Sequence, residues 1–311
     1  MRIVFFGSDD FAAVHLEHLL TRGHEVLCCV TGPDKPQGRG MKMVISPIKQ
    51  MALEHQVPCL QPLSLKDRGI VEALGSYKAD IFVVVAYGRL LTQEILVLPQ
   101  MLCINVHGSL LPQYRGAAPI NWAILNGDKE TGVTIQKMDL ELDTGDIIDQ
   151  EMMVIDDGEN AAQLRGRMAR IGAKLLLKVL DKQPEGQFSL RPQDKTLATY
   201  APKLTKQMGR IDWKKQAQLV FDQVRGLRPW PGAYTFYNGK MLKVIQAQIT
   251  AENIGKSFPG QVVNVNRNGI YVACSDKCLL VKEVQLEAGK AMPAQSFVAG
   301  HKIAQGISFN I

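Results

Sequence analysis

Apolar and polar positions along the first half of the chain predict strands that alternate with helices. Short, almost continuous apolar runs such as RIVFFG (residues 2–7) and ADIFVVVAYG (79–88) are typical of strands buried on both faces. Amphipathic stretches with helical spacing lie between such runs, for example FAAVHLEHLLTRG (11–23). Because alternating strands and helices build βαβ units, we predict an α/β fold with a mostly parallel sheet.

The pattern changes after about residue 190. Residues 191–209 are polar and rich in turn residues, which indicates a linker. One helix-like stretch follows, and then short strand-like runs separated by turns such as Asn238-Gly239, a strong hairpin signal. We therefore predict an α/β domain over residues 1–190, a linker, and a small, mainly antiparallel β-barrel domain over residues 210–311.

The composition is that of an ordinary globular protein. Of the 311 residues, 46% are hydrophobic and 21% are charged, and no run of about 18 apolar residues is present. The chain starts directly with a strand-like run, so we expect no signal peptide and no membrane span. The six cysteines form no CxxC pair and lie mostly in apolar runs. This pattern favours free thiols in a reducing cytoplasm over a metal site or disulfides, and we expect a cytoplasmic monomer.

Charge is distributed unevenly along the chain. Residues 203–311 contain 15 Lys and Arg against 6 Asp and Glu, a net charge of +9, whereas the whole chain carries +6. The residues before this segment are therefore slightly acidic. A basic C-terminal domain favours a nucleic-acid partner. Solubilising charge that is unevenly spread is the alternative explanation.

The stretch INVHGSLLPQYRGAAPINWAI (104–124) carries the first candidate chemistry. Asn105 and His107 lie two residues apart at the end of a predicted strand, so their side chains point to the same face. Ligands of open α/β sheets bind beyond the carboxyl ends of the strands. An amide donor and an imidazole that can carry charge near neutral pH could therefore act on one point. A polar cap that bonds its own backbone is the alternative.

A second stretch, KMDLELDTGDIIDQ (137–150), places Asp143 and Asp146 around a Thr-Gly turn. This loop could lie across the same edge of the sheet and bring a carboxylate to His107. An isolated turn in which Asp143 bonds its own backbone is the alternative. An aspartic protease is excluded, because such enzymes need two Asp loops of this kind in a mainly β fold.

The combination of motifs resembles the formyltransferases that use 10-formyltetrahydrofolate. The three motifs that carry this resemblance are NVHGSLLP (105–112), RGAAP (115–119) and LDTG (142–145). Within that superfamily, nearly the whole chain resembles the methionyl-tRNA formyltransferases. The supporting segments are FFGSDDFA (5–12), PDKPQGRGMKM (33–43), VVAYGRLL (84–91), GRIDW (209–213) and VRGLRPWPGAY (224–234).

One departure from the family pattern is visible in the first turn. The family usually has Gly-Thr-Pro-Asp/Glu-Phe, whereas this chain has Gly7-Ser8-Asp9-Asp10-Phe11. We expect the missing proline to matter little, provided that Asp10 and Phe11 keep their places.

The resemblance implies a Rossmann-like N-terminal domain, an OB-like C-terminal barrel and transfer of a formyl group from 10-formyltetrahydrofolate to the α-amine of methionyl initiator tRNA. It also implies that neither a metal nor a membrane takes part. The implied catalytic residues are Asn105, His107 and Asp143. The expected folate pocket comprises Ser109, Leu110, Leu111 and Pro112, with the end of the neighbouring strand, Tyr87-Gly88, as a second wall.

The glycine-rich segment of residues 34–47 is the other functional candidate. The basic residues expected to contact the tRNA acceptor end are Lys35, Arg39 and Lys42, with Arg39 flanked by Gly38 and Gly40. Without the resemblance, a surface loop with incidental charge would be the better interpretation.

Several other classes of protein share parts of this sequence pattern. Formyltransferases that act on an amino sugar or a purine precursor, and folate-consuming hydrolases, would share Asn105, His107 and Asp143. A purine-type enzyme needs no C-terminal domain, and a sugar-type enzyme has no reason for +9 charge there. A nicotinamide-dependent dehydrogenase is disfavoured, because FGSDDFA lacks the G-x-G-x-x-G fingerprint. The three intact polar residues also argue against a non-catalytic RNA-binding protein.

Overall fold

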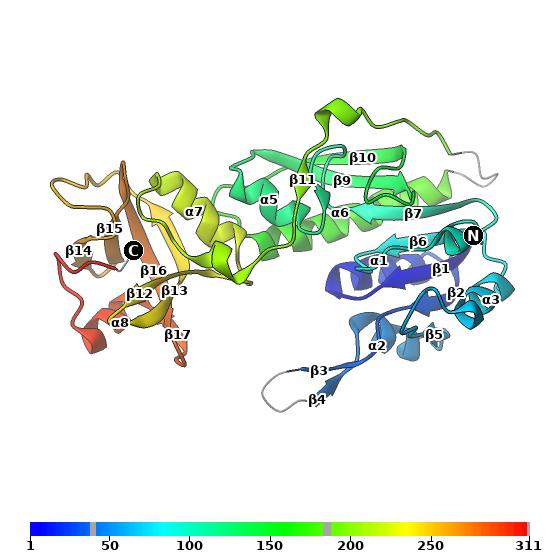
Figure 1. Cartoon of the computed structure of the whole chain (residues 1–311), viewed down its shortest axis with the longest axis horizontal. Coiled ribbons are helices and arrows are strands. Elements are labelled where there is room, and N and C mark those ends of the chain that lie inside the picture. Colours follow the sequence, from blue (N-terminus) through cyan, green and yellow to red (C-terminus); the bar gives the residue numbers. More distant parts are fainter. Residues whose placement is uncertain (38–41, 183–187, 310–311) are drawn as a thin grey trace. The chain divides into compact units, whose positions relative to one another are not determined.

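The computed structural model describes residues 1–37, 42–182 and 188–309 (Figure 1). They form two compact units, each assembled from several segments of the chain. The first unit comprises Met1–Pro119, Thr131–Val154 and Arg165–Ala201; the second comprises Ile120–Glu130, Ile155–Leu164 and Pro202–Ile311. The finer limits of linker and domains expected from the sequence stay a prediction.

A seven-stranded sheet forms the centre of the first unit, in the order β10-β9-β7-β6-β1-β2-β5. The strands are β1 (Arg2–Gly7), β2 (Glu25–Val30), β5 (Cys59–Leu60), β6 (Ile81–Val85), β7 (Leu102–His107), β9 (Glu130–Lys137) and β10 (Ile147–Val154). The five strands from β7 to β5 pair in parallel, whereas β7 and β9 are antiparallel. This arrangement confirms the predicted α/β fold with a mostly parallel sheet.

Helices cover both faces of this sheet. They are α1 (Asp10–Thr21), α2 (Pro47–Glu54), α3 (Arg68–Ser76), α4 (Gln93–Leu96) and α6 (Ala161–Asp181). Leu74 of α3 and Ile95 of α4 share a core cluster with Phe6 and Phe82 of the strands. On α1 and α6, His15 and Gly172 approach so closely that a Cβ on the glycine would lie 2.7 Å from the His15 Nε2. Both faces are therefore shielded from water, which explains the continuous apolar strands.

The unusual first turn has a structural explanation. Asp9 is the N-cap of α1, and its carboxylate accepts hydrogen bonds from the backbone N–H groups of Phe11 and Ala12. An aspartate at this position satisfies backbone donors that no residue within the helix can reach. Asp9 thus supplies a helix start where the family usually has a proline.

The first unit also contains short strand pairs that are separate from its central sheet. A hairpin joins β3 (Lys35–Gln37) to β4 (Lys42–Val44). The two-residue strand β8 (Arg115–Gly116) pairs in parallel with β11 (Tyr200–Ala201), which follows the single turn η1 (Lys195–Leu197). The pairing of β8 with β11 holds the loop of residues 112–118 against residues 200 and 201.

The second unit is built around an antiparallel sheet in the order β12-β13-β16-β15-β14, with β17 paired to β16. Its elements are α5 (Pro119–Leu125), η2 (Lys206–Gly209), α7 (Ala217–Gly226), β12 (Ala233–Tyr237), β13 (Lys240–Ile249), β14 (Val262–Asn266), β15 (Gly269–Ala273), β16 (Cys278–Leu286), β17 (Ala291–Pro293) and α8 (Ala294–His301). The predicted hairpin turn joins β12 to β13, with Asn238 and Gly239 at φ +48° and +74°. Trp213, Phe297 and Phe309 lie at the centre of the core.

The predicted antiparallel domain is therefore confirmed. The strand pairings among the described residues form an open series, so the closed OB-like barrel stays a prediction.

All six cysteines carry free thiols, as expected. Burial raises the pKa of the Cys103 and Cys274 thiols to about 12, so neither is a reactive thiolate near neutral pH. Within the described part of the chain, no helix combines the length and the apolar character that crossing a membrane requires.

Candidate active site

The candidate site lies where three parallel strands end. Gly7 of β1 pairs with Val85 of β6, and Val85 in turn pairs with Val106 of β7, so the three carboxyl ends are level. A Cβ on Gly7 would lie 2.7 Å from the Ala12 Cβ and 3.2 Å from the Val85 carbonyl oxygen. The position of Gly7 therefore requires glycine. On β7, His107 follows Val106 and lies at the same edge of the sheet.

Polar side chains from two strands face one another at this edge. The antiparallel register places Gln136 opposite Asn105 and Thr134 opposite His107. Thr134 and Gln136 are buried, with 0% and 2% of their surface exposed, among apolar neighbours on β9. The sequence interpretation missed both residues. Their signal was two polar side chains that alternate with the apolar residues Val133 and Ile135 along β9.

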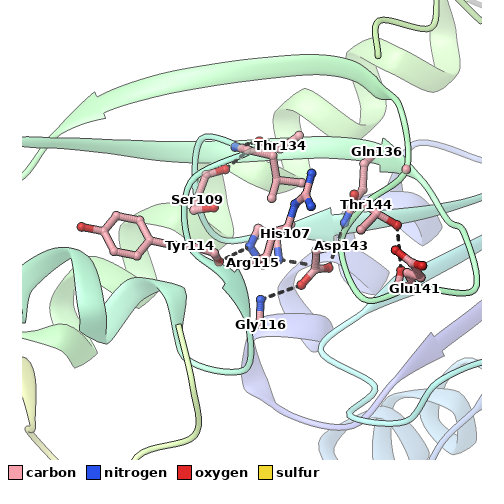
Figure 2. Close-up of polar contacts among 12 residues, drawn as sticks. His107, Ser109, Tyr114, Arg115, Gly116, Thr134, Gln136, Glu141, Asp143 and Thr144 are labelled. Carbon is pink, nitrogen blue, oxygen red and sulfur yellow. Dashed lines mark hydrogen bonds and ion pairs between the residues drawn. The ribbon is translucent and has the colours of Figure 1, made fainter. Parts of the chain in front are cut away.

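The structure brings His107 and Asp143 together (Figure 2). Nδ1 of His107 lies 3.5 Å from Oδ1 of Asp143, and only 6% and 8% of the two side chains are exposed. On the other side of the ring, Nε2 lies 2.9 Å from the carbonyl oxygen of Tyr114. Since both nitrogens face oxygen acceptors, the ring can donate to both only when it carries two protons.

Two hydrogen bonds orient the Asp143 carboxylate. Its Oδ2 accepts from the backbone N–H of Gly116 at 2.8 Å, and its Oδ1 accepts from Nε2 of Gln136 at 2.9 Å. Asp143 itself adopts a left-handed conformation with φ +56°. A Cβ on Gly145 would lie 1.9 Å from the Lys137 carbonyl oxygen, so the Asp-Thr-Gly turn lies directly against the backbone of β9. The turn and its carboxylate are thereby held in one arrangement.

Asn105 differs from its neighbours in that its amide is available. The side chain is partly exposed, and it forms no hydrogen bond with any residue that the structure describes. An unpaired amide beside the His107–Asp143 pair can donate to a ligand without first breaking a protein contact.

The 109–112 loop is supported from beneath by Thr134. The Thr134 hydroxyl donates to the Ser109 carbonyl oxygen at 2.6 Å and accepts from the backbone N–H of Leu111 at 3.1 Å. The side chains of Ser109 and Leu111 are buried, whereas Leu110 and Pro112 are partly exposed. Of the four expected folate residues, Leu110 and Pro112 thus have partly exposed side chains, whereas the other two are buried.

At the second expected wall, Tyr87-Gly88, the Tyr87 side chain is buried. The Tyr87 ring packs edge-on against Phe6, with ring centroids 5.5 Å apart, and only 5% of the residue is exposed. Burial raises the pKa of the Tyr87 hydroxyl. The Tyr87 carbonyl oxygen accepts from the Ser8 hydroxyl at 3.3 Å, which joins the loops after β6 and β1. The ring therefore belongs to the core beneath the sheet edge.

The segment expected to act as a linker lies against Tyr114 and Arg115, which follow the 109–112 loop. Thr199 accepts twice: its carbonyl oxygen from the Arg115 N–H and its hydroxyl from the Tyr114 N–H, both at 2.8 Å. Gln193 is buried and accepts from the Arg115 guanidinium. The sequence interpretation assigned no site residue here, because a polar, turn-rich segment has no local signature of burial.

The expected tRNA-contacting residues are only partly covered by the structure. Lys35 and Lys42 belong to the paired strands β3 and β4, and Arg39 lies outside the described residues. At the base of the hairpin, the Lys49 ammonium lies 2.5 Å from the Asp34 carboxylate. Hydrogen bonds from Lys49 and Gln61 lower the pKa of Asp34. Lys49 therefore anchors the hairpin.

Among the described residues, no group of three or more His, Cys, Asp or Glu side chains is placed to hold a metal ion. The polar groups at the site are the His107–Asp143 pair, the available amide of Asn105 and oriented backbone groups.

Comparison with known proteins defines the class to which this fold and site belong. Residues 1–180 match the family described as formyl transferase, and residues 203–302 match the formyl transferase C-terminal domain. The chain belongs to the formyl transferase family. It is 45% identical to the methionyl-tRNA formyltransferase of Caldanaerobacter subterraneus subsp. tengcongensis, over 98% of this chain and 99% of that protein. It is 44% identical to the methionyl-tRNA formyltransferase of Geotalea uraniireducens, over 98% and 97% of the two chains.

Solved structures share the fold at lower identity. HypX from Aquifex aeolicus in complex with tetrahydrofolic acid has a TM-score of 0.68 at 19% identity over 96% of this chain. This chain spans 47% of HypX. The N-formyltransferase from Helicobacter canadensis, in complex with folinic acid and dTDP-3-aminofucose, has a TM-score of 0.66 at 19% identity, over 93% and 99% of the two chains. These likenesses support the fold alone.

Proposed function

We propose that this protein transfers the formyl group of 10-formyltetrahydrofolate to the α-amine of methionyl initiator tRNA, giving formylmethionyl-tRNA for translation initiation. The observation that carries the proposal is the His107–Asp143 pair beside the available amide of Asn105, in a chain similar to methionyl-tRNA formyltransferases over nearly its whole length. Translation initiation takes place in the cytoplasm, which is where we place the enzyme.

Asn105 and His107 stabilise negative charge on the formyl oxygen. Attack of the amine on the formyl carbon gives a tetrahedral intermediate whose oxygen carries the charge. The Asn105 amide donates to that oxygen directly, and one preorganised donor of this kind contributes about 3–4 kcal/mol. His107 already directs Nε2 at a carbonyl oxygen, that of Tyr114, and exchanges this acceptor for the oxyanion.

Asp143 stabilises the charged His107 ring and accepts the proton that the amine loses. Its carboxylate is oriented by Gly116 and Gln136 toward His107, where it stabilises the positively charged imidazole ring. The same carboxylate accepts the amine proton, directly or through a water molecule. Breakdown of the intermediate breaks the bond to N10, which takes up a proton as tetrahydrofolate leaves, and the formyl group stays on the methionine nitrogen.

The 109–112 loop and the loop before Asp143 bind the folate. Leu110 and Pro112 present partly exposed apolar surface on the first loop. On the second, Leu140 and Leu142 are 55% and 53% exposed, although leucine side chains usually pack inside. Apolar side chains beside backbone polar groups suit a flat heteroaromatic ring with a hydrogen-bonding edge.

The β3–β4 hairpin and the basic C-terminal domain bind the tRNA. Lys35, Arg39 and Lys42 contact the acceptor end, while the second unit, as an OB-like module, holds the phosphate backbone. Support for this assignment comes from the +9 charge of residues 203–311. Phosphate contacts position the RNA, and contacts near the acceptor end select it.

A formylation assay tests the proposal. Purified protein is mixed with 10-formyltetrahydrofolate and methionyl initiator tRNA, and formylmethionyl-tRNA is measured. Elongator methionyl-tRNA and a reaction without acceptor serve as controls. We expect rapid transfer to the initiator tRNA alone. Transfer to a nucleotide-linked amino sugar without any transfer to tRNA would contradict the proposal and assign the chain to a different branch of the family.

A further inference from the structure

Gln193 occupies a central position beneath the candidate active site. The residue is buried, with 9% of its surface exposed, and each end of its amide is bonded. Its Oε1 accepts from Nε and Nη2 of Arg115 at 3.1 and 2.7 Å. Its Nε2 lies 2.9 Å from the carbonyl oxygen of Asp143, 2.7 Å from that of Gly145 and 3.4 Å from Oε1 of Gln136. One side chain therefore joins three segments of the first unit.

The donor end of Gln193 holds the turn that carries the Asp143 carboxylate. The two bonded carbonyl oxygens lie on either side of the Thr144 peptide, so a single NH₂ group bridges the turn. Asp143 is in a left-handed conformation, which is unfavourable for a residue with a side chain unless its surroundings hold it there. The bridge therefore helps to set the direction in which the carboxylate points toward His107.

The acceptor end of Gln193, its Oε1, holds the Arg115 side chain. Arg115 is 4% exposed, and a buried guanidinium needs acceptors for its N–H groups. The next residue, Gly116, supplies the N–H that bonds Oδ2 of Asp143. Gln193 thus acts on the Asp143 carboxylate through the turn before it and through the Gly116 donor beside it.

A side chain at this position must accept from Arg115 and also donate to the carbonyl oxygens of Asp143 and Gly145. The amide of glutamine does both. Glutamate would accept from Arg115 but has no proton for two carbonyl oxygens when ionised, and asparagine is one methylene shorter. We propose that Gln193 is a positioning residue that aligns Asp143 with His107 for formyl transfer. The inference rests on the proposed function, because formyl transfer is the activity that Gln193 would affect.

The variant Gln193→Glu separates the two ends of the side chain. It retains the acceptor for Arg115 and the size of the residue, but it points a carboxylate at two carbonyl oxygens. We expect kcat to fall by about 10- to 100-fold, because small misplacements of a catalytic group have effects of this size. KM for tRNA and for 10-formyltetrahydrofolate should stay within about twofold, since Gln193 contacts neither substrate in this scheme.

The pH profile provides a second readout. At lower pH the introduced carboxyl group takes up a proton and can donate to one of the two carbonyl oxygens. The kcat of Gln193→Glu, relative to that of the wild type, should therefore rise as the pH falls. Gln193→Ala has no such group, so its relative kcat should not rise with acid, and its midpoint of thermal unfolding should be lower because Arg115 loses its acceptor.

Leu197→Ala is the matched control, since Leu197 lies on the same segment and is 60% exposed. It should leave kcat unchanged. Folate binding and thermal unfolding are measured for every variant, and if Gln193→Glu does not fold, the kcat and KM of Gln193→Ala decide. A kcat within twofold of wild type, or a loss confined to KM, would overturn the inference. A wild type that transfers no formyl group to tRNA would instead overturn the proposed function, so the two failures are distinguishable.

Discussion

The backbone N–H of Gly116 donates to Oδ2 of Asp143 over 2.8 Å, although 27 residues separate the two in the sequence. Gly116 has φ +124°, and a Cβ at this position would lie 2.7 Å from the carbonyl oxygen of Ala201. The hydrogen bond therefore depends on a glycine that lets β8 lie directly against β11.

Gly116→Ala should disturb the site through the backbone. The added methyl group pushes β8 away from β11 and removes the donor from Asp143, so we expect turnover to fall by about 10- to 100-fold. Backbone strain of this kind should also lower the free energy of unfolding by about 1–3 kcal/mol. Gly23→Ala is the control, because Gly23 has φ +77° but nothing within 4 Å of its Cβ position. Equal losses of activity in both variants would show that strain alone is responsible.

Asn105→Ala should reduce kcat by about 100- to 1,000-fold, the usual effect of removing one oxyanion donor. The amide has no hydrogen-bond partner among the described residues, so its removal leaves no described group unpaired and stability should be little affected. Steady-state formylation and urea unfolding measure the two quantities. A loss of stability that matches the loss of activity would argue for a structural role of this amide.

Asp143→Asn should lower turnover by about 100- to 10,000-fold while folate binding is retained. The substitution keeps the size of the side chain but removes the charge that faces His107 and the group that accepts the amine proton. Single-turnover formylation at saturating folate measures the effect. Near-normal turnover in this variant would exclude Asp143 as the proton acceptor.

His15 should make the protein less stable in acid. Burial is the largest cause that lowers the pKa of His15 to about 4, from 6.5. The unfolded chain therefore takes up this proton at higher pH than the folded protein does. The free energy of unfolding should fall as the pH drops from about 6.5 to 4, by about 3 kcal/mol in total, and His15 should add nothing further below that window.

Urea unfolding at several pH values measures this contribution. His15→Leu should flatten the pH dependence in that window. An unchanged slope in His15→Leu would assign the acid sensitivity to other groups.

Salt should weaken tRNA binding far more than folate binding. Phosphate contacts by the basic C-terminal domain release counterions, so log Kd should rise linearly with log salt concentration. Replacing Lys240 and Lys243 of β13 by Gln should reduce the slope by about one to two if both contact phosphates. Titrations of labelled tRNA at several salt concentrations test this. A slope near zero for the wild type would exclude the domain as a phosphate-binding surface.

The hydrophobic pattern by itself determined that the first part of this protein has an α/β fold and that the second part is built of antiparallel strands. Continuous apolar runs mark strands buried on both faces, amphipathic runs mark helices, and Asn238-Gly239 marks a hairpin, because each signal arises from neighbours within a few residues. The strand-end pair Asn105 and His107 was visible for the same reason. The Asp143 loop was recognisable as a turn, and its role came from the resemblance to formyltransferases.

The tertiary structure alone decided which groups hold the Asp143 carboxylate. Gln136 reaches the site through the register of β9 on β7, and Gln193 through contacts that span 78 residues to Arg115 and 50 residues to Asp143. A polar residue in a turn-rich segment reads as exposed in the sequence. It becomes buried and fully bonded only when distant segments pack around it, because burial of polar groups depends on partners that local sequence does not specify.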